Sequence, residues 1–215
     1  MKIFSKFIFI SAVTCILACI GDFLAIFIFG AYFPGYSQLK DTISLLGSSG
    51  SPVSREISFW WCIIGVIFIF FGIGFKKEFA GKGFYAKFAT WLIMLYGIGE
   101  GIGSCAFKAD HRAIGITTSG IIHDILGGIG MTAILFLPLV MQKVITRTEM
   151  PGFFRMSKIV FISGLIAILL FLFRYSTNED NFFTIYKGLW QRLYLLTTYI
   201  YLTTIAVIMI KRQKQ

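Results

Sequence analysis

Four ionisable side chains interrupt long apolar stretches of this sequence: Asp22, Glu100, His123 and Asp124. An ionisable group in hydrocarbon costs about 3 kcal/mol on insertion scales, so such residues generally mark a ligand site, an ion pathway or a proton-transfer route. A histidine beside a carboxylate can exchange protons near neutral pH. Of the two histidines, His123 is the better candidate, because His111 lies in a polar segment where we expect it to be solvated.

Further polar residues stand near the ends of the same apolar stretches. A helix rises about 1.5 Å per residue, which places Asp22, Glu100 and Asp124 at depths of about 13, 10 and 9 Å from the same side of the membrane. We therefore expect one ligand-binding site in this layer, built from Asp22, Asp41, Ser44, Glu100, His123, Asp124, Gln191 and Arg192. The guanidinium of Arg192 is suited to a phosphate or a carboxylate.

The composition determines which elements position these residues. Apolar residues form 57% of the 215-residue chain, charged residues only 14%, and 24 residues are Phe. The mean hydropathy is +0.80. A soluble domain of this size needs far more charge on its surface. The net charge of +10 is not gathered on a hydrophilic domain, which argues against a nucleic-acid partner. The sequence predicts an integral membrane protein.

Six apolar runs are each long enough to cross roughly 30 Å of hydrocarbon. None shows strand-like alternation, and a spanning segment must satisfy its own backbone hydrogen bonds, so we expect all six to be α-helices. The sequence thus predicts a single all-α membrane domain over residues 1–215, with helices at about 7–31, 57–75, 86–107, 118–142, 157–175 and 190–210.

The basic residues predict the orientation of this bundle. Most of the 20 Lys and Arg residues lie before the first span, in the second and fourth connections, or after the last span. Because basic loops stay in the cytoplasm, we expect both termini to be cytoplasmic. The polar layer then lies in the outer half of the membrane. The basic side is suited to anionic lipids of the inner leaflet.

Small and polar residues indicate which helix faces pack together. The run Gly97–Gly103 contains two interleaved G-x-x-x-G pairs and predicts close helix contacts, either within the chain or in a dimer. Asp22 has small same-face neighbours, namely Cys15, Ala18, Cys19 and Ala25. A polar stripe on the sixth span is expected to face the interior, formed by Gln191, Tyr194, Thr198 and Tyr201. The fifth span is expected to face lipid.

The first connection has an organisation of its own. Residues 39–46 resemble a short amphipathic helix at the membrane interface, ended by the turn 47–50. Ser51-Pro52 is a plausible start for the second span. The Gly/Ser turn is either a plain turn or an anion site made of backbone N–H groups. Cys62 and Cys105 both lie near outer helix ends, but spacing alone cannot establish a disulfide.

Three motifs resemble the domain-of-unknown-function 998 family, whose members are multi-pass prokaryotic membrane proteins. The motifs are Asp41-Thr42-Ile43-Ser44-Leu45-Leu46-Gly47, His123-Asp124-x-x-Gly127-Gly128 and Gly188-Leu189-Trp190-Gln191-Arg192-Leu193. The resemblance covers nearly the whole chain, implies a six-helix bundle in a prokaryotic plasma membrane, and marks Asp41, Ser44, His123, Gln191 and Arg192 as motif positions. The family has no agreed activity, so the resemblance implies no mechanism.

Three interpretations of the polar layer remain open. In the first, an outward-facing cavity binds or transports a lipid head group or a small polar molecule, with membrane lipids as partners and no cofactor. In the second, Asp22, Asp41, His123 and Asp124 hold a metal that activates water for lipid hydrolysis, with Ser44 nearby. In the third, Arg192 pairs with Asp124 or Glu100 and only fixes the helices. The oligomeric state is left open.

Overall fold

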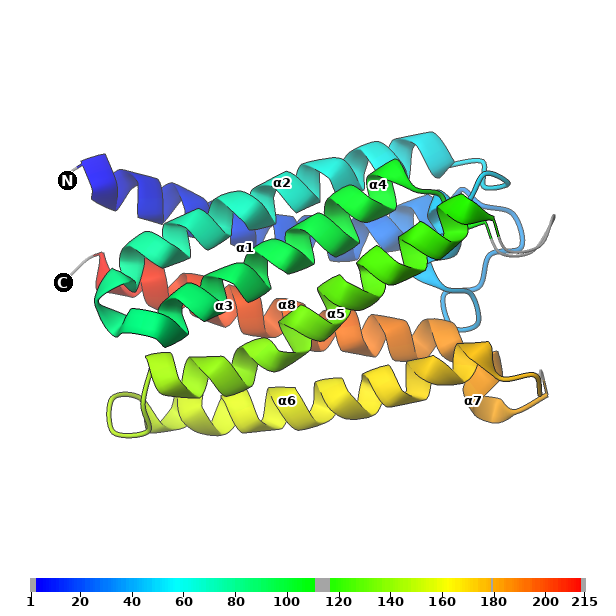
Figure 1. Ribbon diagram of the computed structural model, residues 1–215. Helices are drawn as coiled ribbons and strands as arrows, with labels where there is room; N and C mark the ends of the chain where they lie inside the picture. The colour runs from blue at the N-terminus through cyan, green and yellow to red at the C-terminus, as the bar shows by residue number, and fades with distance from the viewer. Residues whose placement is uncertain (1–2, 111–116, 179, 214–215) are drawn as a thin grey trace.

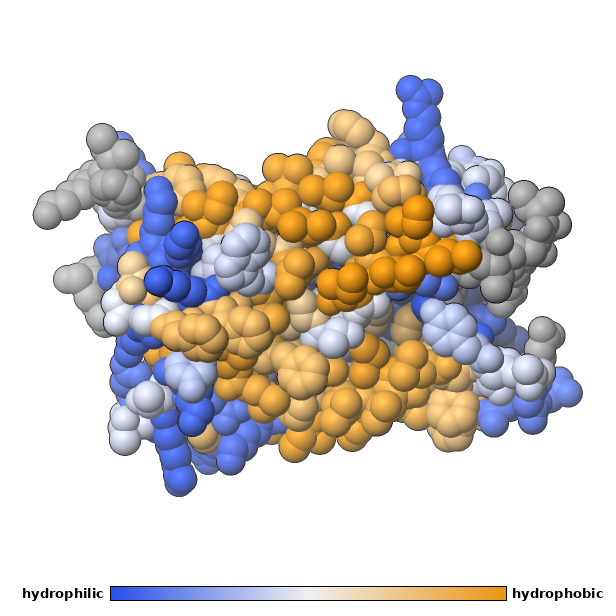
Figure 2. All heavy atoms as spheres, viewed as in Figure 1, coloured by the Kyte–Doolittle hydropathy of each residue, from blue (hydrophilic) through white to orange (hydrophobic). Residues whose placement is uncertain are grey.

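The computed structural model describes residues 3–110, 117–178 and 180–213, which are helical and contain no β-strand. Five helices are long and apolar enough to cross a membrane (Figure 1): α1 (Ile3–Ala31), α2 (Ser54–Glu78), α5 (Thr118–Val144), α6 (Pro151–Leu172) and α8 (Lys187–Arg212). Hydrophobic residues cover the middle of the molecule, and hydrophilic residues gather at its two ends (Figure 2). The predicted all-α membrane architecture is confirmed at this level.

The remaining elements are short and connect the long helices. They are η1 (Ile43–Gly47), η2 (Ala80–Lys82), α3 (Gly83–Tyr96), η3 (Gly97–Gly103), α4 (Ser104–Ala106), η4 (Phe173–Tyr175) and α7 (Phe182–Ile185). The predicted third span, 86–107, corresponds to α3, η3 and α4, which follow one another without a gap. The α-helical part alone has 14 residues, about 21 Å of helix, which is too short to cross a membrane.

The middle of this third segment is a π-helical turn, and its glycines allow two neighbouring helices to approach. A Cβ on Gly101 would lie 2.2 Å from the Cα of Gly65 in α2, and one on Gly99 would lie 2.3 Å from the carbonyl oxygen of Leu126 in α5. Any larger residue would collide with backbone on either side. These glycine contacts are internal to the chain, which confirms the predicted close packing.

The helices run roughly along one axis, and the two chain termini lie at the same end of the bundle (Figure 1). We call this the termini end; it also holds the α2–α3 and α5–α6 connections. The opposite end, which we call the η1 end, holds η1 and α7. Between the two ends, α1 packs against α2 and α8, α3 packs against α5, and α6 packs against α8. Buried aromatic residues fill the core, among them Phe68, Phe71, Phe75 and Phe79.

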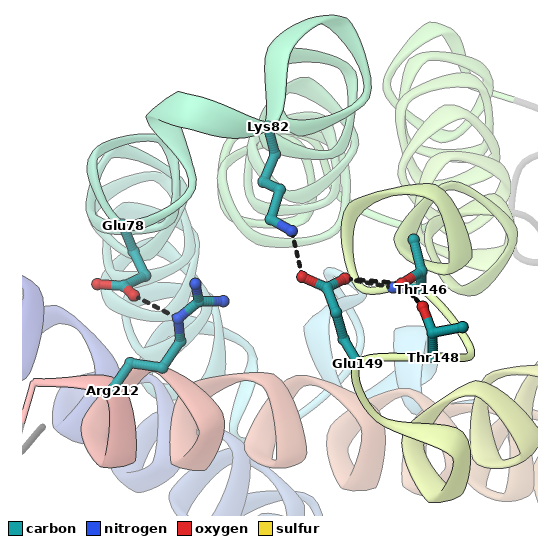
Figure 3. Close-up of polar contacts among 6 residues, drawn as sticks. All are labelled: Glu78, Lys82, Thr146, Thr148, Glu149 and Arg212. Carbon is teal, nitrogen blue, oxygen red and sulfur yellow. Dashed lines mark hydrogen bonds and ion pairs between the residues drawn. The ribbon is translucent and has the colours of Figure 1, made fainter.

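Two ion pairs join the elements at the termini end (Figure 3). Lys82 Nζ lies 2.5 Å from Glu149 Oε1, and Arg212 Nε lies 3.0 Å from Glu78 Oε1. The other carboxylate oxygen of Glu149 accepts the backbone N–H and the hydroxyl of Thr146. These hydrogen bonds, with Lys82 as the largest contributor, lower the pKa of Glu149 to about 2.

The first connection differs from its prediction. The helix is a 3-10 turn limited to Ile43–Gly47, and α2 begins at Ser54 rather than at Ser51-Pro52. Ile43 and Leu46 are buried against side chains of α1 and α2. Residues 39–46 therefore do not form one amphipathic helix, and Ile43 and Leu46 instead pack into the η1 end of the bundle.

The predicted inward faces are confirmed. Every member of the α8 stripe is buried, as are the four small residues around Asp22. The stripe also makes direct contacts: the Tyr194 hydroxyl donates to the Met131 carbonyl oxygen at 2.5 Å, and Tyr201 shares a 2.8 Å hydrogen bond with Ser157. The helix at 151–172 has the smallest buried share of the five long helices, as expected for a lipid-facing position.

Candidate functional site

A groove with a cavity volume of about 470 Å³ opens at the η1 end. Such a volume falls in the range of small-molecule sites, roughly 300–1,000 Å³. Its walls come from the first connection, the residues before and within α5, η4 and the start of α8. Both charge signs line it, and its ionisable side chains are Asp41, Asp110, Asp124, Arg174, Tyr175 and Lys187. Phe33 and Leu45 add apolar surface.

Arg174 is the central cation of this groove. One of its terminal nitrogens donates to Asp124 Oδ1 at 3.2 Å and also to the Tyr175 hydroxyl. Tyr175 in turn donates to the second oxygen of Asp124 at 3.3 Å. The Nε of Arg174 is buried without a hydrogen-bond partner among the described residues. Arg174 was not among the predicted site residues, because it ends an apolar span in which no face is distinguished by polar residues.

Asp110 closes one side of the groove by binding the Gly/Ser turn. Its two carboxylate oxygens accept the backbone N–H and the hydroxyl of Ser49, each at 2.7 Å. The turn at 47–50 therefore holds an anion, but that anion is a carboxylate of the same chain. This contact joins the first connection to the segment before α5.

A second, inner cavity of about 40 Å³ lies among α1, α2, α3, η3, α5 and α8. Its polar wall residues are Asp22, Ser44, Tyr96, Glu100, Ser104, Gln191, Tyr194 and Tyr199. This volume is sufficient for water but not for a drug-sized ligand. Ser44 lines both the inner cavity and the groove, so it stands between the two spaces.

Asp22 of α1 forms hydrogen bonds to α2 and α8 at this inner cavity. Its oxygens accept the indole N–H of Trp60 in α2 at 2.9 Å and the hydroxyl of Tyr199 in α8 at 2.5 Å. The residue is only 4% exposed. Burial of a carboxylate is tolerated when donors satisfy its oxygens, so these two bonds account for Asp22 inside the bundle.

Residues 16–208 match the family described as Protein of unknown function (DUF998). The chain belongs to this family. The match runs from within α1 to within α8 and confirms the family resemblance found in the motifs. No curated protein and no solved structure matches the chain. The DUF998 name carries no activity, so the arrangement of the polar residues has to supply the functional argument.

Arg192 fastens the first connection to α8. Its Nε donates to Gln38 Oε1 at 3.0 Å, one terminal nitrogen donates to the carbonyl oxygens of Asp41 and Gly188, and the other donates to the Tyr36 hydroxyl at 2.6 Å. These bonds use four of the five N–H donors of a guanidinium. The suggested pairing of Arg192 with Asp124 or Glu100 is wrong, because Asp124 pairs with Arg174.

Asp41 and Gln191 help to hold the same connection. Asp41 Oδ2 accepts the backbone N–H of Ser37 at 2.8 Å, and Gln191 Oε1 accepts the backbone N–H of Ile43 at 2.7 Å. Tyr36 donates its hydroxyl to the Thr42 carbonyl oxygen at 3.0 Å. Burial raises the pKa of Tyr36 to about 12, although the charge of Arg192 opposes the rise.

His123 in α5, one of the predicted site residues, lies outside both cavity walls. Its Nδ1 lies 3.0 Å from the carbonyl oxygen of Phe107. A carbonyl oxygen only accepts, so Nδ1 carries the proton in this bond. The contact connects α5 to the end of α4. His111, expected to be solvated, falls outside the described residues.

The proposed metal ligands do not converge. Asp22 lines the inner cavity, Asp41 and Asp124 line the groove, and His123 lines neither. Across residues 3–110, 117–178 and 180–213, no three His, Cys, Asp or Glu side chains are grouped in a way that could hold a metal ion. Cys62 and Cys105, considered as a possible disulfide, are both free thiols. The geometry gives no support to a metal-dependent hydrolase.

Proposed function

We propose that this DUF998 protein binds a lipid head group or another small polar molecule in the groove at the η1 end. The observation that carries the proposal is a ligand-sized space that contains Arg174, Lys187 and three carboxylates. Ligand sites commonly combine apolar walls with a few placed polar groups. The groove has this character, whereas the inner cavity is too small for such a ligand.

Arg174 is the proposed anchor for a phosphate or carboxylate of the ligand. Its charged hydrogen bonds now go to Asp124 and Tyr175, but its buried Nε has no described partner. A guanidinium can present two parallel N–H groups to a phosphate, which makes Arg174 suited to such a ligand. Arg192 then serves the site indirectly, since it holds the connection that forms one wall.

We further propose that α3, η3 and α4 together form a sixth span, so that both termini are cytoplasmic and the groove faces outward in a prokaryotic plasma membrane. The continuous helical segment Gly83–Ala106, about 36 Å at standard helix rise, supports this count. Single cysteines introduced by Ser49→Cys and Thr148→Cys in a cysteine-free background test it. We expect an impermeant maleimide to label only Ser49→Cys on intact cells; labelling of both from outside would contradict the count.

Thermal unfolding of the purified protein tests the binding proposal. The probes are short-chain phosphatidylethanolamine, short-chain phosphatidylglycerol and free glycerol phosphate. We expect at least one probe to raise the Tm of the wild type, and Arg174→Gln to weaken its apparent affinity by about tenfold or more. Mass spectrometry of the protein released from native membranes should show a bound lipid if the ligand is a head group, and none if it is a free molecule.

Arg155→Gln is the matched control, because it removes the same charge from an exposed position in the α6 helix near the termini end. It should leave the response to the probe unchanged. Equal responses of the wild type and Arg174→Gln to every probe, with both proteins folded, would refute a ligand held by Arg174.

A further inference from the structure

The wall of the inner cavity includes one acceptor and one donor that have no hydrogen-bond partner among the described residues. Among the described residues, no hydrogen bond reaches the carboxylate of Glu100, which lines this cavity. Gln191 is 7% exposed, and its Oε1 is fixed by the N–H of Ile43. Its amide NH₂ group therefore points away from Ile43 and has no acceptor in the described part of the chain. Two such groups on one small cavity indicate a binding site for a molecule that can both donate and accept hydrogen bonds.

The volume of the cavity limits the bound molecule to about the size of water. About 40 Å³ exceeds the ~10–15 Å³ that one water requires, and a buried water usually has two to four polar partners. Glu100, Gln191 and Ser44 provide partners of that kind on three different elements. A hydrated space beside a carboxylate is also a place where a proton can be delivered.

Every element around Glu100 contributes to its electrostatic surroundings. The charged or titratable groups facing it are Asp22 from α1, Tyr96 from α3, Asp124 from α5, Arg174 from η4, and Tyr194 and Tyr199 from α8. From α2 it meets apolar side chains, namely Trp61, Ile64 and Phe68. The one cation in this set already forms an ion pair with Asp124.

Glu100 thus differs from the other carboxylates of the site. Asp22 has two donors, Asp124 has Arg174 and Tyr175, and Glu100 has no direct partner among the described residues. An ionised carboxylate without donors is costly inside a membrane, and a bound proton removes that charge. The π-helical turn places this group at the cavity, and such turns often occur at functional sites.

Ser44 supplies the connection to the groove. A hydroxyl both donates and accepts a hydrogen bond, so it can pass a proton between water on its two sides. Ser44 lines both spaces, and the groove opens at the η1 end. The proton leaves water in the groove, passes Ser44 and cavity water, and ends on a carboxylate oxygen of Glu100.

We propose that the inner cavity is a proton-binding site, in which Glu100 takes up a proton from the η1-end groove through Ser44. This site goes beyond ligand binding in the groove and requires no ligand. Protonation of Glu100 is measured without any probe bound. A negative result for proton binding therefore says nothing about ligand binding in the groove, and the reverse also holds.

Infrared difference spectroscopy of the full chain in liposomes tests this proposal directly. The acidic-minus-alkaline spectrum should contain a carbonyl band from a protonated carboxyl group. We expect Glu100→Gln to remove one component of this band and Asp22→Asn to leave that component in place, because the oxygens of Asp22 are held by Trp60 and Tyr199. A band that is identical in the wild type and in folded Glu100→Gln would overturn the assignment.

Chemical labelling of the wild type gives a second test that needs no variant. Dicyclohexylcarbodiimide reacts with protonated carboxyl groups in membranes, and peptide mapping locates the modified residue. We expect Glu100 to be modified, less so as the pH is raised, and equally with or without sodium ions. No modification of Glu100 at acidic pH overturns the proposal. Protection by sodium at constant pH also overturns it, since the site then takes a metal cation.

The route is tested by acidifying one side of oriented liposomes before labelling. Acid on the η1 side should promote modification of Glu100 quickly, whereas acid on the termini side should not. Ser44→Ala, which removes only the hydroxyl, should slow this response. An equally fast response from the termini side would refute entry through the groove.

Discussion

The two ends of this bundle handle charge in opposite ways. At the termini end, Lys82 and Glu149 form an ion pair while their side chains remain 30% and 42% exposed. At the η1 end, Arg192 is 5% exposed and donates to Gln38, Tyr36 and two backbone carbonyl oxygens. Exposed ion pairs contribute about 0–1 kcal/mol and weaken in salt, whereas buried charged hydrogen bonds are worth more and leave costly gaps when broken.

This difference bears on the proposed ligand site. Water can solvate the exposed charges of Lys82 and Glu149 nearly as well as they stabilise each other. The η1 end keeps its connection in place with buried bonds, and this fixed connection frames both the groove and the inner cavity. Binding sites depend on such fixed supporting contacts around the residues that touch the ligand. The buried contacts of the η1 end are therefore required for the ligand binding proposed there.

Replacing Arg192 should produce the largest loss of stability. Arg192→Leu removes the shared donor, so the carbonyl oxygen of Asp41, Gln38 Oε1 and the Tyr36 hydroxyl all lose their bond to α8. We expect the free energy of unfolding to fall by about 3 kcal/mol or more, since breaking buried charged contacts has costs of this order. Chemical unfolding in mild detergent provides the measurement.

Arg174→Leu shows how a less buried arginine at the same end contributes to the free energy of unfolding. Arg174 pairs with Asp124 at 3.2 Å, and the two side chains are 18% and 24% exposed. We expect it to cost about 1 kcal/mol. Equal losses of unfolding free energy for Arg174→Leu and Arg192→Leu would show that the Arg174–Asp124 pair stabilises this end as much as Arg192 does.

Glycine substitution in the π-helical turn should have the next largest effect. Gly101→Ala places a methyl group 2.2 Å from the Cα of Gly65, so two backbones must separate. Overpacking of this kind costs about 1–3 kcal/mol. Gly128→Ala is the matched control, because a Cβ there has no neighbour within 4 Å. A loss as large for Gly128→Ala would mean that glycine flexibility, not contact between helices, explains the effect.

Tyr36→Phe should weaken the η1 end by a smaller amount. The hydroxyl donates to the Thr42 carbonyl oxygen and accepts from Arg192, so its removal should cost about 1–2 kcal/mol. The pKa of Tyr36 rises from 10.0 to about 12, so its contribution is present below pH 10 and is lost as the pH rises toward 12. The stability difference from Tyr36→Phe should therefore shrink over that interval. A constant difference would contradict this linkage.

The sequence predicted the helices well and the connections poorly. Apolar runs locate all five long helices, because membrane burial requires about twenty continuous apolar residues. The start of α2 was misplaced because Ser51-Pro52 has the residue types of a helix start, while burial of Ile43 and Leu46 decides where the chain turns. The π-helical turn was also missed, although the glycine run that permits it was recognised as a packing motif.

The candidate site shows a similar division. Depth along a helix placed Asp22, Glu100 and Asp124 in one layer; the structure puts the first two on the inner cavity and Asp124 on the groove. Partner choice was not predictable. Two acceptors of Arg192 are backbone carbonyl oxygens, which every residue has, and Asp124 pairs with Arg174 instead. Such pairings depend on the packing of helices far apart in sequence.

The smallest expected effect lies at the termini end, in the pair of Lys82 and Glu149. Glu149→Gln removes a charge that Lys82 and Thr146 stabilise, but the pair is exposed, so we expect only a slight fall in Tm at neutral pH and low salt. High salt should remove most of the difference by screening. Lys158→Gln is a control, since it removes an exposed charge at the same end.

The pH dependence of this pair completes the comparison of the two ends. The pKa of Glu149 is lowered from 4.5 to about 2, so its contribution is present above pH 4.5 and is lost as the pH falls toward 2. The unfolding curves of the wild type and Glu149→Gln should converge over that interval, because both side chains are then neutral. Tyr36 changes stability only at alkaline pH, so the two ends respond at opposite extremes. If the Tm difference between the wild type and Glu149→Gln persists in both acid and high salt, the pair contributes more to stability than its exposed charges explain. The two ends would then not differ in the way described.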